Sequence, residues 1–231
     1  MRRIVWAGAV GLLAACQLGN TAELVFERDP RVLYAVETEA PLVALTLDDG
    51  PDAVATPQLL GVLEAHRARA TFFLLGERVE AEPGVVASIL AGGHEIANHG
   101  MRDVPAVDLA PAEFEADLLA ADAVLRAFAP QRWYRPGSGW YEDWMFPILE
   151  RHGYRMALGS AYPLDAALPS VPTTSRLALW QLEPGGILVL HDVGRRGERS
   201  ARTLERVLPE LADRGLRVVT LSELVAACGG C

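Results

Sequence analysis

The sequence contains no lysine, so all 21 of its basic residues are arginine. We attribute this to the codon bias of a GC-rich genome. The formal net charge is −9. Proteins that bind nucleic acid present a clustered basic face to the phosphates, and an acidic chain of this kind shows no such face. A nucleic-acid partner is therefore not expected.

The sequence also lacks internal repeats, low-complexity tracts and Pro/Gly-rich linkers between residues 41 and 227. With 231 residues and 51% hydrophobic content, the chain can bury a substantial core in one large α/β domain or in two small ones. Because no linker divides this stretch, we expect residues 41–227 to form a single domain and residues 17–40 to form an N-terminal extension.

Cysteine is scarce, and the first of the three cysteines ends a possible targeting segment. Residues 1–3 are cationic at Arg2 and Arg3, residues 4–12 are an apolar stretch too short to span a bilayer, and residues 13–16 are Leu-Ala-Ala-Cys. Residues 1–16 thus resemble a bacterial lipoprotein signal with Cys16 as the lipidated residue. The alternative is an uncleaved apolar N-terminus. We expect export to the cell envelope, with membrane attachment only through a lipid on Cys16.

The other two cysteines, Cys228 and Cys231, lie in a Cys-Gly-Gly-Cys tail at residues 228–231. An exported protein tolerates disulfides, so this even pair is expected to form a bridge, although so small a loop adds little stability. A redox or zinc role is the alternative. It is less favoured because no second ligand pair and no following helix accompany the two cysteines.

Apolar runs alternate with helical patterns along the chain. Strands are expected at residues 42–47, 70–75, 94–98, 132–135, 155–159, 187–190 and 217–220. Helices are expected at residues 56–67, 77–91, 111–128, 140–152, 200–213 and 222–227. This alternation implies a parallel sheet buried on both faces. We expect it to close as a distorted (β/α) barrel of about seven or eight strands.

Chemically active side chains stand where these strands end. Asp48 and Asp49 end the first strand, and His99, Arg135 and His191 follow three others. The carboxyl ends of the strands of an α/β barrel converge on one mouth, so these residues are predicted to form one site. Two adjacent carboxylates repel each other, which indicates that a cation, an arginine or a shared proton separates their roles.

Four motifs carry a resemblance to a known family. They are Asp-Asp-Gly-Pro at residues 48–51 after an apolar strand, Asn-His at 98–99, Tyr-Arg-Pro at 134–136 and Leu-Val-Leu-His-Asp at 188–192. In this order they resemble the polysaccharide deacetylases of carbohydrate esterase family 4, the nodulation-protein type of deacetylase domain, over roughly residues 41–226. The resemblance implies a metal-dependent hydrolase that removes acetyl groups from an N-acetylated polysaccharide or glycan.

The resemblance also implies a metal site. It makes Asp48 the general base and Asp49 and His99 metal ligands. Family members usually have a second histidine four residues after the first, but here that position is Asp103. Residues i and i+4 share one face of a helical turn, so Asp103 is expected to be the third ligand. The alternative is an exposed Asp103 paired with Arg102. Zinc is favoured as the metal, with manganese and cobalt as alternatives.

Arg135 is implied to hold the base, and a backbone N–H after it is implied to bind the oxyanion. The family's second proline and its aromatic residue are replaced by Gly137 and Ser138, so we assign the oxyanion N–H to Ser138. A Gly-rich turn between a strand and a helix explains the same residues structurally. Both readings place this segment after the strand that ends at Arg135.

His191 is implied to be the general acid that protonates the departing amine. Asp165 lies where the family has an aspartate that orients this histidine or the arginine, but the tryptophan that follows it in the family is Ala166 here. Trp140 and Tyr141 could stack on sugar rings, since aromatic faces bind the apolar faces of pyranoses. A helix packed against the barrel explains Trp140 equally well.

The remaining histidines, His66, His94 and His152, are expected to be structural or surface residues. Two other functions stay open beside the deacetylase. One is an O-acetyl carbohydrate esterase, which the same residues could serve, and the other is a catalytically silent glycan-binding module on the same fold. The presence of the aspartates and histidines of the motifs favours an enzyme. The sequence carries no signal for an oligomeric state.

Overall fold

The computed structural model describes residues 29–228 of the chain. The expected lipoprotein signal with Cys16 lies outside this range, and so does Cys231. Cys228 takes part in a disulfide. Its partner lies outside the described residues. Between residues 29 and 228, no helix is long and apolar enough to cross a membrane.

The described chain is built around one eight-stranded sheet in which every strand pair is parallel. The strands run in the order β1-β6-β5-β4-β3-β2-β7, and β8 pairs with the first half of β2. Their bounds are β1 Val32–Leu33, β2 Leu42–Asp48, β3 Ala70–Leu74, β4 Glu95–Asn98, β5 Trp133–Tyr134, β6 Arg155–Ala157, β7 Ile187–His191 and β8 Arg217–Val219.

The sheet curls until its two sides meet. Beyond β6, the N–H of Ala161 donates to the carbonyl of Ile187 and the N–H of Val189 donates to the carbonyl of Ala161, each at 3.0 Å. This segment joins the β6 side of the sheet to β7. The prediction of a distorted (β/α) barrel with a single domain is therefore confirmed, and all seven expected strands are present.

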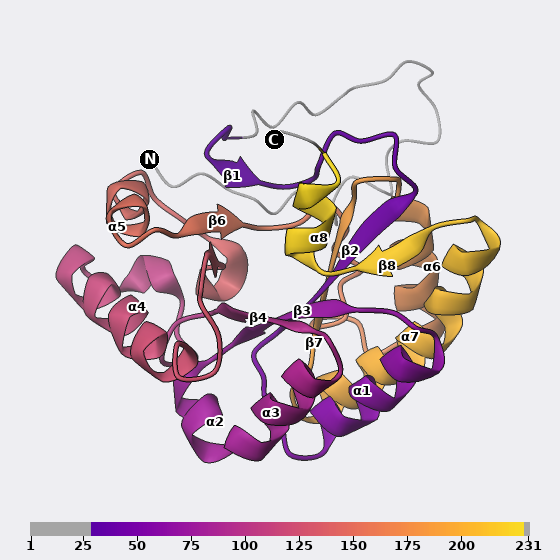
Figure 1. Cartoon of the computed structure of the whole chain (residues 1–231), viewed down its shortest axis with the longest axis horizontal. Helices are drawn as coiled ribbons and strands as arrows, with labels where there is room; N and C mark the ends of the chain where they lie inside the picture. The colour runs from indigo at the N-terminus through magenta and orange to yellow at the C-terminus, as the bar shows by residue number, and fades with distance from the viewer. Residues whose placement is uncertain (1–28, 229–231) are drawn as a thin grey trace.

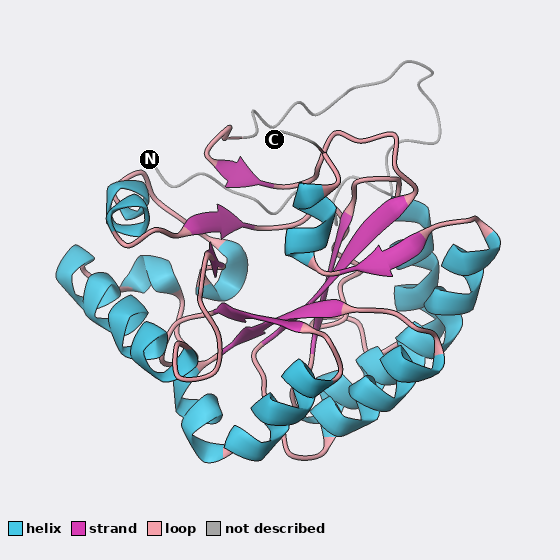
Figure 2. Ribbon diagram, in the orientation of Figure 1, coloured by secondary structure: helices cyan, strands magenta, loops and turns pink. Residues whose placement is uncertain are grey.

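Helices surround the curled sheet (Figures 1 and 2). They are α1 Ala55–Ala65, α2 Gly76–Ala81, α3 Pro83–Ala91, α4 Pro111–Leu125, α5 Met145–Arg151, α6 Val171–Gln181, α7 Gly194–Asp213 and α8 Leu221–Ala226, with short 3-10 turns at Ala106–Asp108 and Gly137–Gly139. In α7 the buried residues recur every three or four positions, for example Ala201, Leu204, Val207 and Leu211. This spacing forms one apolar face that packs toward the barrel.

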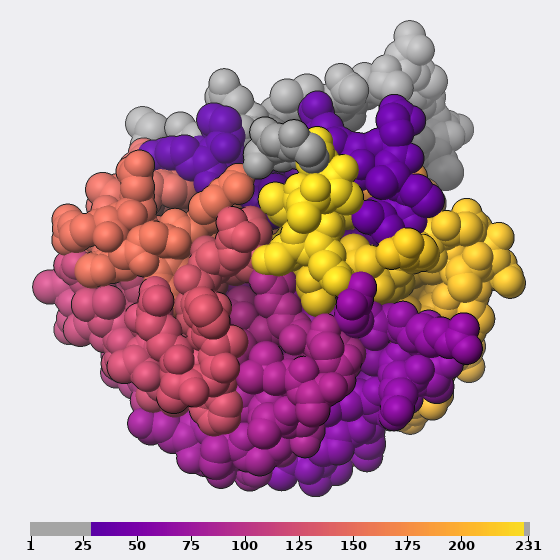
Figure 3. All heavy atoms as spheres, viewed as in Figure 1, coloured from indigo at the N-terminus to yellow at the C-terminus, as the bar shows by residue number. Residues whose placement is uncertain are grey.

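The last helix covers the amino ends of the strands. The N–H of Leu221 donates to Thr71 Oγ1 at 2.8 Å, the N–H of Ser222 donates to Glu95 Oε2 at 3.1 Å, and Trp133 Nε1 donates to Ser222 Oγ at 2.9 Å. These bonds lay α8 across the starts of β3, β4 and β5. Figure 3 shows α8, in yellow, seated between the indigo region of β1 and the magenta middle of the chain. The carboxyl ends lie on the opposite side of the barrel.

Five elements differ from the sequence-based expectations. Helix α5 begins at Met145, five residues later than the helix expected at 140–152. Strand β1 lies within residues 17–40, which were expected to be an extension outside the domain. The helix expected at 77–91 is two helices, because Pro83 begins a new helix after Ala81. Helix α6 was not predicted, since residues 171–176 read Val-Pro-Thr-Thr-Ser-Arg, without helical apolar spacing. Helix α7 begins at Gly194, six residues earlier than expected.

Candidate active site

The two adjacent aspartates sit at the turn after β2. Asp48 is the last residue of β2, and Asp49 has a φ of 76°, in the left-handed region that residues with a side chain rarely adopt. Both residues are buried, at 5% and 8% exposed. Such strained backbone is typical of functional sites, where the surrounding structure holds it in place. The turn sends the two carboxylates to different partners.

Asp48 is bound by a fully anchored arginine. Nη1 of Arg135 lies 2.5 Å from Asp48 Oδ1 and also donates to Thr46 Oγ1 at 2.8 Å. The other two nitrogens donate to the carbonyls of Ala157 at 3.0 Å and Leu158 at 2.7 Å. Arg135 is only 2% exposed. Its guanidinium is thus fixed by the end of β6, and it fixes the Asp48 carboxylate in turn.

Asp49 faces the histidine that follows β4. Oδ1 of Asp49 lies 3.3 Å from His99 Nε2, and the other ring nitrogen of His99 lies 2.8 Å from the carbonyl of Arg135. Burial opposes ionisation of Asp49, but its bond to His99 and the nearby charges lower its pKa to about 2. Burial likewise opposes the charged form of His99, while Asp49 raises the pKa of the imidazole. Arg196 Nη1 lies 3.5 Å from Asp49 Oδ2 at the rim.

His191 lies directly beside the first aspartate. It ends β7, and the strand register pairs it with Asp48. Asp165 Oδ2 lies 2.9 Å from His191 Nδ1 and accepts the backbone N–H of His191 at 3.0 Å. Burial lowers the pKa of His191, but Asp165 and the other carboxylates outweigh it and raise the pKa to about 9. At neutral pH this imidazole carries a proton that it can donate.

Asp103 does not join Asp49 and His99. Its side chain is exposed, and Arg102 pairs with Asp117 of α4 at 3.1 Å rather than with Asp103. The expectation of a third ligand assumed a helical turn after His99, but Gly100 has a φ of 94° and the segment is not helical. Within residues 29–228, no three His, Cys, Asp or Glu side chains are grouped to hold a metal ion.

Comparison with known proteins decides the family. The profile of the family described as "Polysaccharide deacetylase" matches residues 35–157. A peptidoglycan-N-acetylglucosamine deacetylase from Bacillus cereus is 34% identical over 197 residues, which cover 84% of this chain and 92% of that protein. The chain belongs to the polysaccharide deacetylase family. The resemblance inferred from the four motifs is confirmed.

Solved structures of other family members share the fold. The crystal structure of a peptidoglycan N-acetylglucosamine deacetylase matches with a TM-score of 0.80 at 28% identity, over 85% of this chain and 93% of that one. A family 4 acetyl xylan esterase from Clostridium thermocellum, in complex with a cobalt ion, matches with a TM-score of 0.75 at 27% identity, over 82% of this chain and 93% of that one.

In this family member, the aromatic residues after the arginine motif separate into core and surface. Tyr141 was expected to contact substrate, but it is 3% exposed, and its hydroxyl pairs with that of Tyr34 at 2.7 Å inside the core. Trp144 packs edge-on against Phe114, whereas Trp140 is partly exposed. Tyr141 is therefore a core residue, and of the two predicted sugar-contacting rings only Trp140 is available to a substrate.

Ser138, the predicted oxyanion residue, is exposed and has a φ of 63°. Its hydroxyl donates to the carbonyl of Gly137 at 2.6 Å. The residue stands three positions beyond Arg135, so the turn keeps it near the mouth of the barrel.

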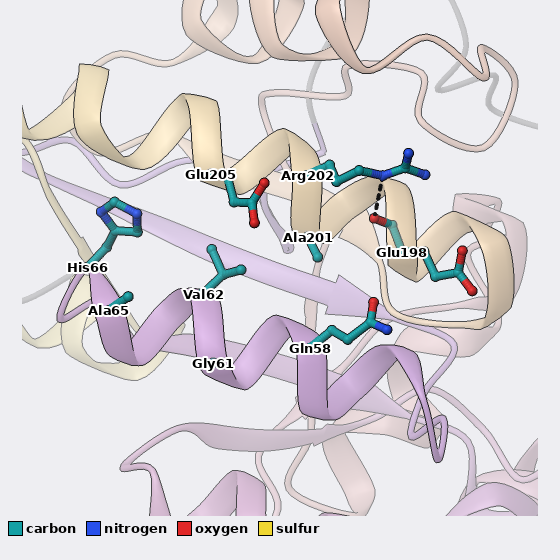
Figure 4. Close-up of a pocket in the computed structure, with 9 residues that line it drawn as sticks. All are labelled: Gln58, Gly61, Val62, Ala65, His66, Glu198, Ala201, Arg202 and Glu205. Carbon is teal, nitrogen blue, oxygen red and sulfur yellow. Dashed lines mark hydrogen bonds between the residues drawn. The ribbon is translucent and has the colours of Figure 1, made fainter.

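The three histidines expected to be structural lie outside the site. His94 Nδ1 accepts the N–H of Ala70 at 3.2 Å, and burial lowers the pKa of His94 to about 4. His152 pairs with Glu115 at 2.7 Å. His66 lines an open groove of about 730 Å³ between α1 and α7 (Figure 4). The residues along this groove include none of the predicted site residues.

One buried acid next to the site, Asp192, belongs to the motif at residues 188–192, but the sequence analysis gave it no role. Asp192 follows His191 and is 0% exposed. Burial and the charges of Asp49 and Asp48 raise its pKa to about 7, while a hydrogen bond from Thr56 opposes that rise. No signal in the sequence marks this bond, because it joins residues 136 positions apart.

Proposed function

We propose that this protein is a hydrolase that uses a divalent metal ion to remove acetyl groups from an N-acetylated polysaccharide or glycan. The observation that carries the proposal is the pairing of Asp48 with His191 in adjacent strands, each side chain held by its own partner. A carboxylate and a protonated imidazole side by side can accept one proton and donate another. Hydrolysis of an amide requires both transfers.

Asp49 and His99 would hold the metal. A carboxylate oxygen and an imidazole nitrogen are common ligands of zinc, manganese and cobalt. The carbonyl of Arg135 lies against Nδ1 of His99, the outer-shell arrangement that orients a ligating histidine through its other nitrogen. Zinc is the favoured ion, and a related esterase is known in complex with cobalt. When bound, a divalent cation polarises a carbonyl and makes water more acidic.

The protein side chains supply the proton transfers. In the proposed reaction, Asp48 takes a proton from the attacking water as the new C–O bond forms at the acetyl carbon. The backbone N–H of Ser138 donates to the carbonyl oxygen, where negative charge develops. His191 gives its proton to the sugar nitrogen as the C–N bond breaks. Acetate and a free amine leave, and Arg135 and Asp165 hold the two proton-transfer groups throughout.

One finding favours a second substrate class. A family 4 acetyl xylan esterase shares this fold at 27% identity, and an ester oxygen is a better leaving group than an amine. The same residues could therefore hydrolyse O-acetyl groups on a glycan. The two classes differ in their need for the acid, because an amine leaves only after it is protonated. His191→Ala should therefore slow amide substrates more than activated aryl acetates.

The test is release of acetate from chitin oligomers, peptidoglycan and acetylated xylan by metal-stripped protein, repeated after addition of zinc, manganese or cobalt. We expect acetate from the N-acetylated polymers only after a metal is added. An Asp48→Asn variant serves as the control for contaminating activity. Release from xylan alone would support the esterase. Binding of glycans without any release would support a catalytically silent module and contradict the proposal.

We also propose that the protein acts in the cell envelope, anchored by a lipid on Cys16. Support comes from the signal-like sequence of residues 1–16 and from the disulfide at Cys228, a bond typical of oxidising compartments. Expression of the full chain in bacteria should place it in the membrane fraction, and Cys16→Ser should release it from that fraction. Equal distribution of both proteins would contradict the anchor.

A further inference from the structure

The turns that carry the two proton-transfer groups are tied together by side chains. Thr56, in the first turn of α1, donates its hydroxyl hydrogen to Asp192 Oδ2 at 2.9 Å and accepts the N–H of Asp52 at 2.8 Å. The N–H of Asp192 donates to the carbonyl of Asp48 at 3.0 Å. Asp52 Oδ2 accepts the N–H of Gly194 at 3.0 Å. Together these bonds connect the turn after β2 to the turn after β7.

This connection includes a carboxyl group in an unfavourable environment. Asp192 is completely buried, and within the described chain its Oδ1 has no hydrogen-bond partner. A buried polar atom without a partner costs stability, and an apolar residue of similar size would avoid that cost. The raised pKa of Asp192 reflects the same environment. Costly polar groups of this kind are expected where function requires them.

Two glycines leave space for Asp192, Gly50 for its carboxyl group and Gly197 for its backbone. A Cβ atom added to Gly50 would lie 2.1 Å from Asp192 Oδ2 and 2.2 Å from Oδ1. One added to Gly197, in the first turn of α7, would lie 2.7 Å from the backbone carbonyl carbon of Asp192. The carboxyl group therefore rests directly on the turn that follows Asp49, and no larger residue fits at either glycine without displacement.

We propose that Thr56 and Asp192 are positioning residues that keep the turn bearing Asp48 and Asp49 in register with the strand bearing His191. The ladder between β2 and β7 ends at the pair formed by Asp48 and His191. Beyond that pair, the backbone bond from Asp192 to Asp48 and the side-chain bonds of Thr56 and Asp52 connect the two turns. Proton transfer needs its groups held within a fraction of an ångström. The roles of Asp48 and His191 rest on the proposed function, but the bonds between the turns do not.

Thr56→Val tests the proposal because it replaces the hydroxyl with a methyl group of similar size. We expect kcat to fall by about tenfold or more, with KM changed less than about twofold, since a buried hydrogen bond to a carboxylate is lost. Thr56→Ser, which keeps the hydroxyl, should stay within about twofold of the wild type in both constants. Thr174→Val is the matched control, because Thr174 is also a buried threonine, 2% exposed, but lies in α6.

Amide hydrogen exchange gives a readout that needs no activity. The amides to follow are those of Asp192 and Leu75, which donate to the carbonyls of Asp48 and Gly50. In Thr56→Val both should exchange about tenfold faster or more, and in Thr56→Ser and Thr174→Val they should be unchanged. A Thr56→Val protein with unchanged amide exchange and unchanged kcat would overturn the proposal. So would a Thr56→Ser protein whose exchange and kcat changed as much as those of Thr56→Val. If the wild type released no acetate, the proposed function would fail. The amide exchange rates would still show whether Thr56 and Asp192 hold the two turns together.

Discussion

Asp48 and Asp49 are neighbours in the chain, yet their surroundings differ. Asp48 Oδ1 lies 2.5 Å from the guanidinium of Arg135. Arg135 is 2% exposed, and all three of its guanidinium nitrogens make hydrogen bonds. Asp49 meets His99 at 3.3 Å and the half-exposed Arg196 at 3.5 Å. The half of the site that we propose for proton transfer is therefore fixed by protein contacts. The half proposed to bind a metal, Asp49 and His99, is also buried, but its contacts are longer and one of them is to an arginine at the surface.

This difference has a physical reason. A proton-transfer group must keep its position through the reaction, and a buried arginine that is itself bonded through all three nitrogens provides that position at low conformational cost. A metal site needs open coordination positions for water and substrate, so incomplete protein ligation is compatible with catalysis. The comparison leads to four predictions, ordered from the largest expected effect to the smallest.

Arg135→Gln should have the largest effect, because it leaves the Asp48 carboxylate buried without its cation. We expect a loss of about 3–5 kcal/mol in the free energy of unfolding, measured by urea denaturation. Arg132→Gln, which changes an exposed arginine three residues earlier, should cost less than about 0.5 kcal/mol. If the two variants were equally stable, the buried pair would not be the fixed half of the site.

Asp48→Asn keeps the shape of the side chain and removes the base. The rate should fall by about a hundredfold or more, while the metal content measured by elemental analysis stays at the wild-type level. Asp213→Asn, which changes an exposed aspartate at the end of α7, should alter neither. Loss of metal in Asp48→Asn would mean that the two aspartates do not divide their roles as proposed.

Asp165→Asn should change the pH dependence of the rate. The pKa of His191 is raised to about 9, so its acid form is present at neutral pH and activity should decline as the pH rises through that value. Without the carboxylate, this decline should move toward the ordinary histidine pKa, with a loss of about tenfold at pH 8 and little loss at pH 5.5. An alkaline limb that did not move would exclude His191 as the group that titrates.

The raised pKa of His191 also affects the stability of the folded chain. A histidine whose pKa is raised on folding stabilises the folded chain most fully below the unfolded value of 6.5, and this contribution is lost as the pH rises through about 9. Asp165→Asn should therefore lower the melting temperature at pH 6 more than at pH 10.

Asp103→Ala should have the smallest effect. Because its side chain is exposed and apart from Asp49 and His99, metal affinity measured by calorimetry should change by less than about threefold, the size expected for an exposed charge. Asp49→Ala should abolish measurable binding. A loss in Asp103→Ala comparable to that in Asp49→Ala would show that the loop after His99 brings Asp103 to the metal when the ion binds.

The sequence predicts those parts of the fold that depend on local pattern. Strands β2, β4 and β7 are apolar runs that end at Asp48, Asn98 and His191, so these strands and their polar ends were found together. The barrel topology then gathers Asp48, His99, Arg135 and His191. Helix α6 and strand β1 were not predicted because the apolar residues of their segments have no clear periodic spacing. Tertiary packing determines the structure of these segments.

The parts of the site that depend on loop geometry were predicted less well. Asp103 was placed by assuming a helical turn, which the positive φ of Gly100 breaks. Tyr141 was placed by its residue type, but its burial depends on packing against α5. The bond between Thr56 and Asp192 joins two turns that are distant in sequence, so only the folded structure reveals it.

The most direct test of the metal-dependent reaction is a titration of metal-stripped protein with zinc while acetate release from an N-acetylglucosamine oligomer is recorded. The account predicts no release from the stripped protein and a rise that saturates at one zinc ion per chain. Asp49→Ala should show no rise at the same zinc concentrations. Full activity in the stripped protein, or equal activation of Asp49→Ala, would contradict metal-dependent deacetylation at this site.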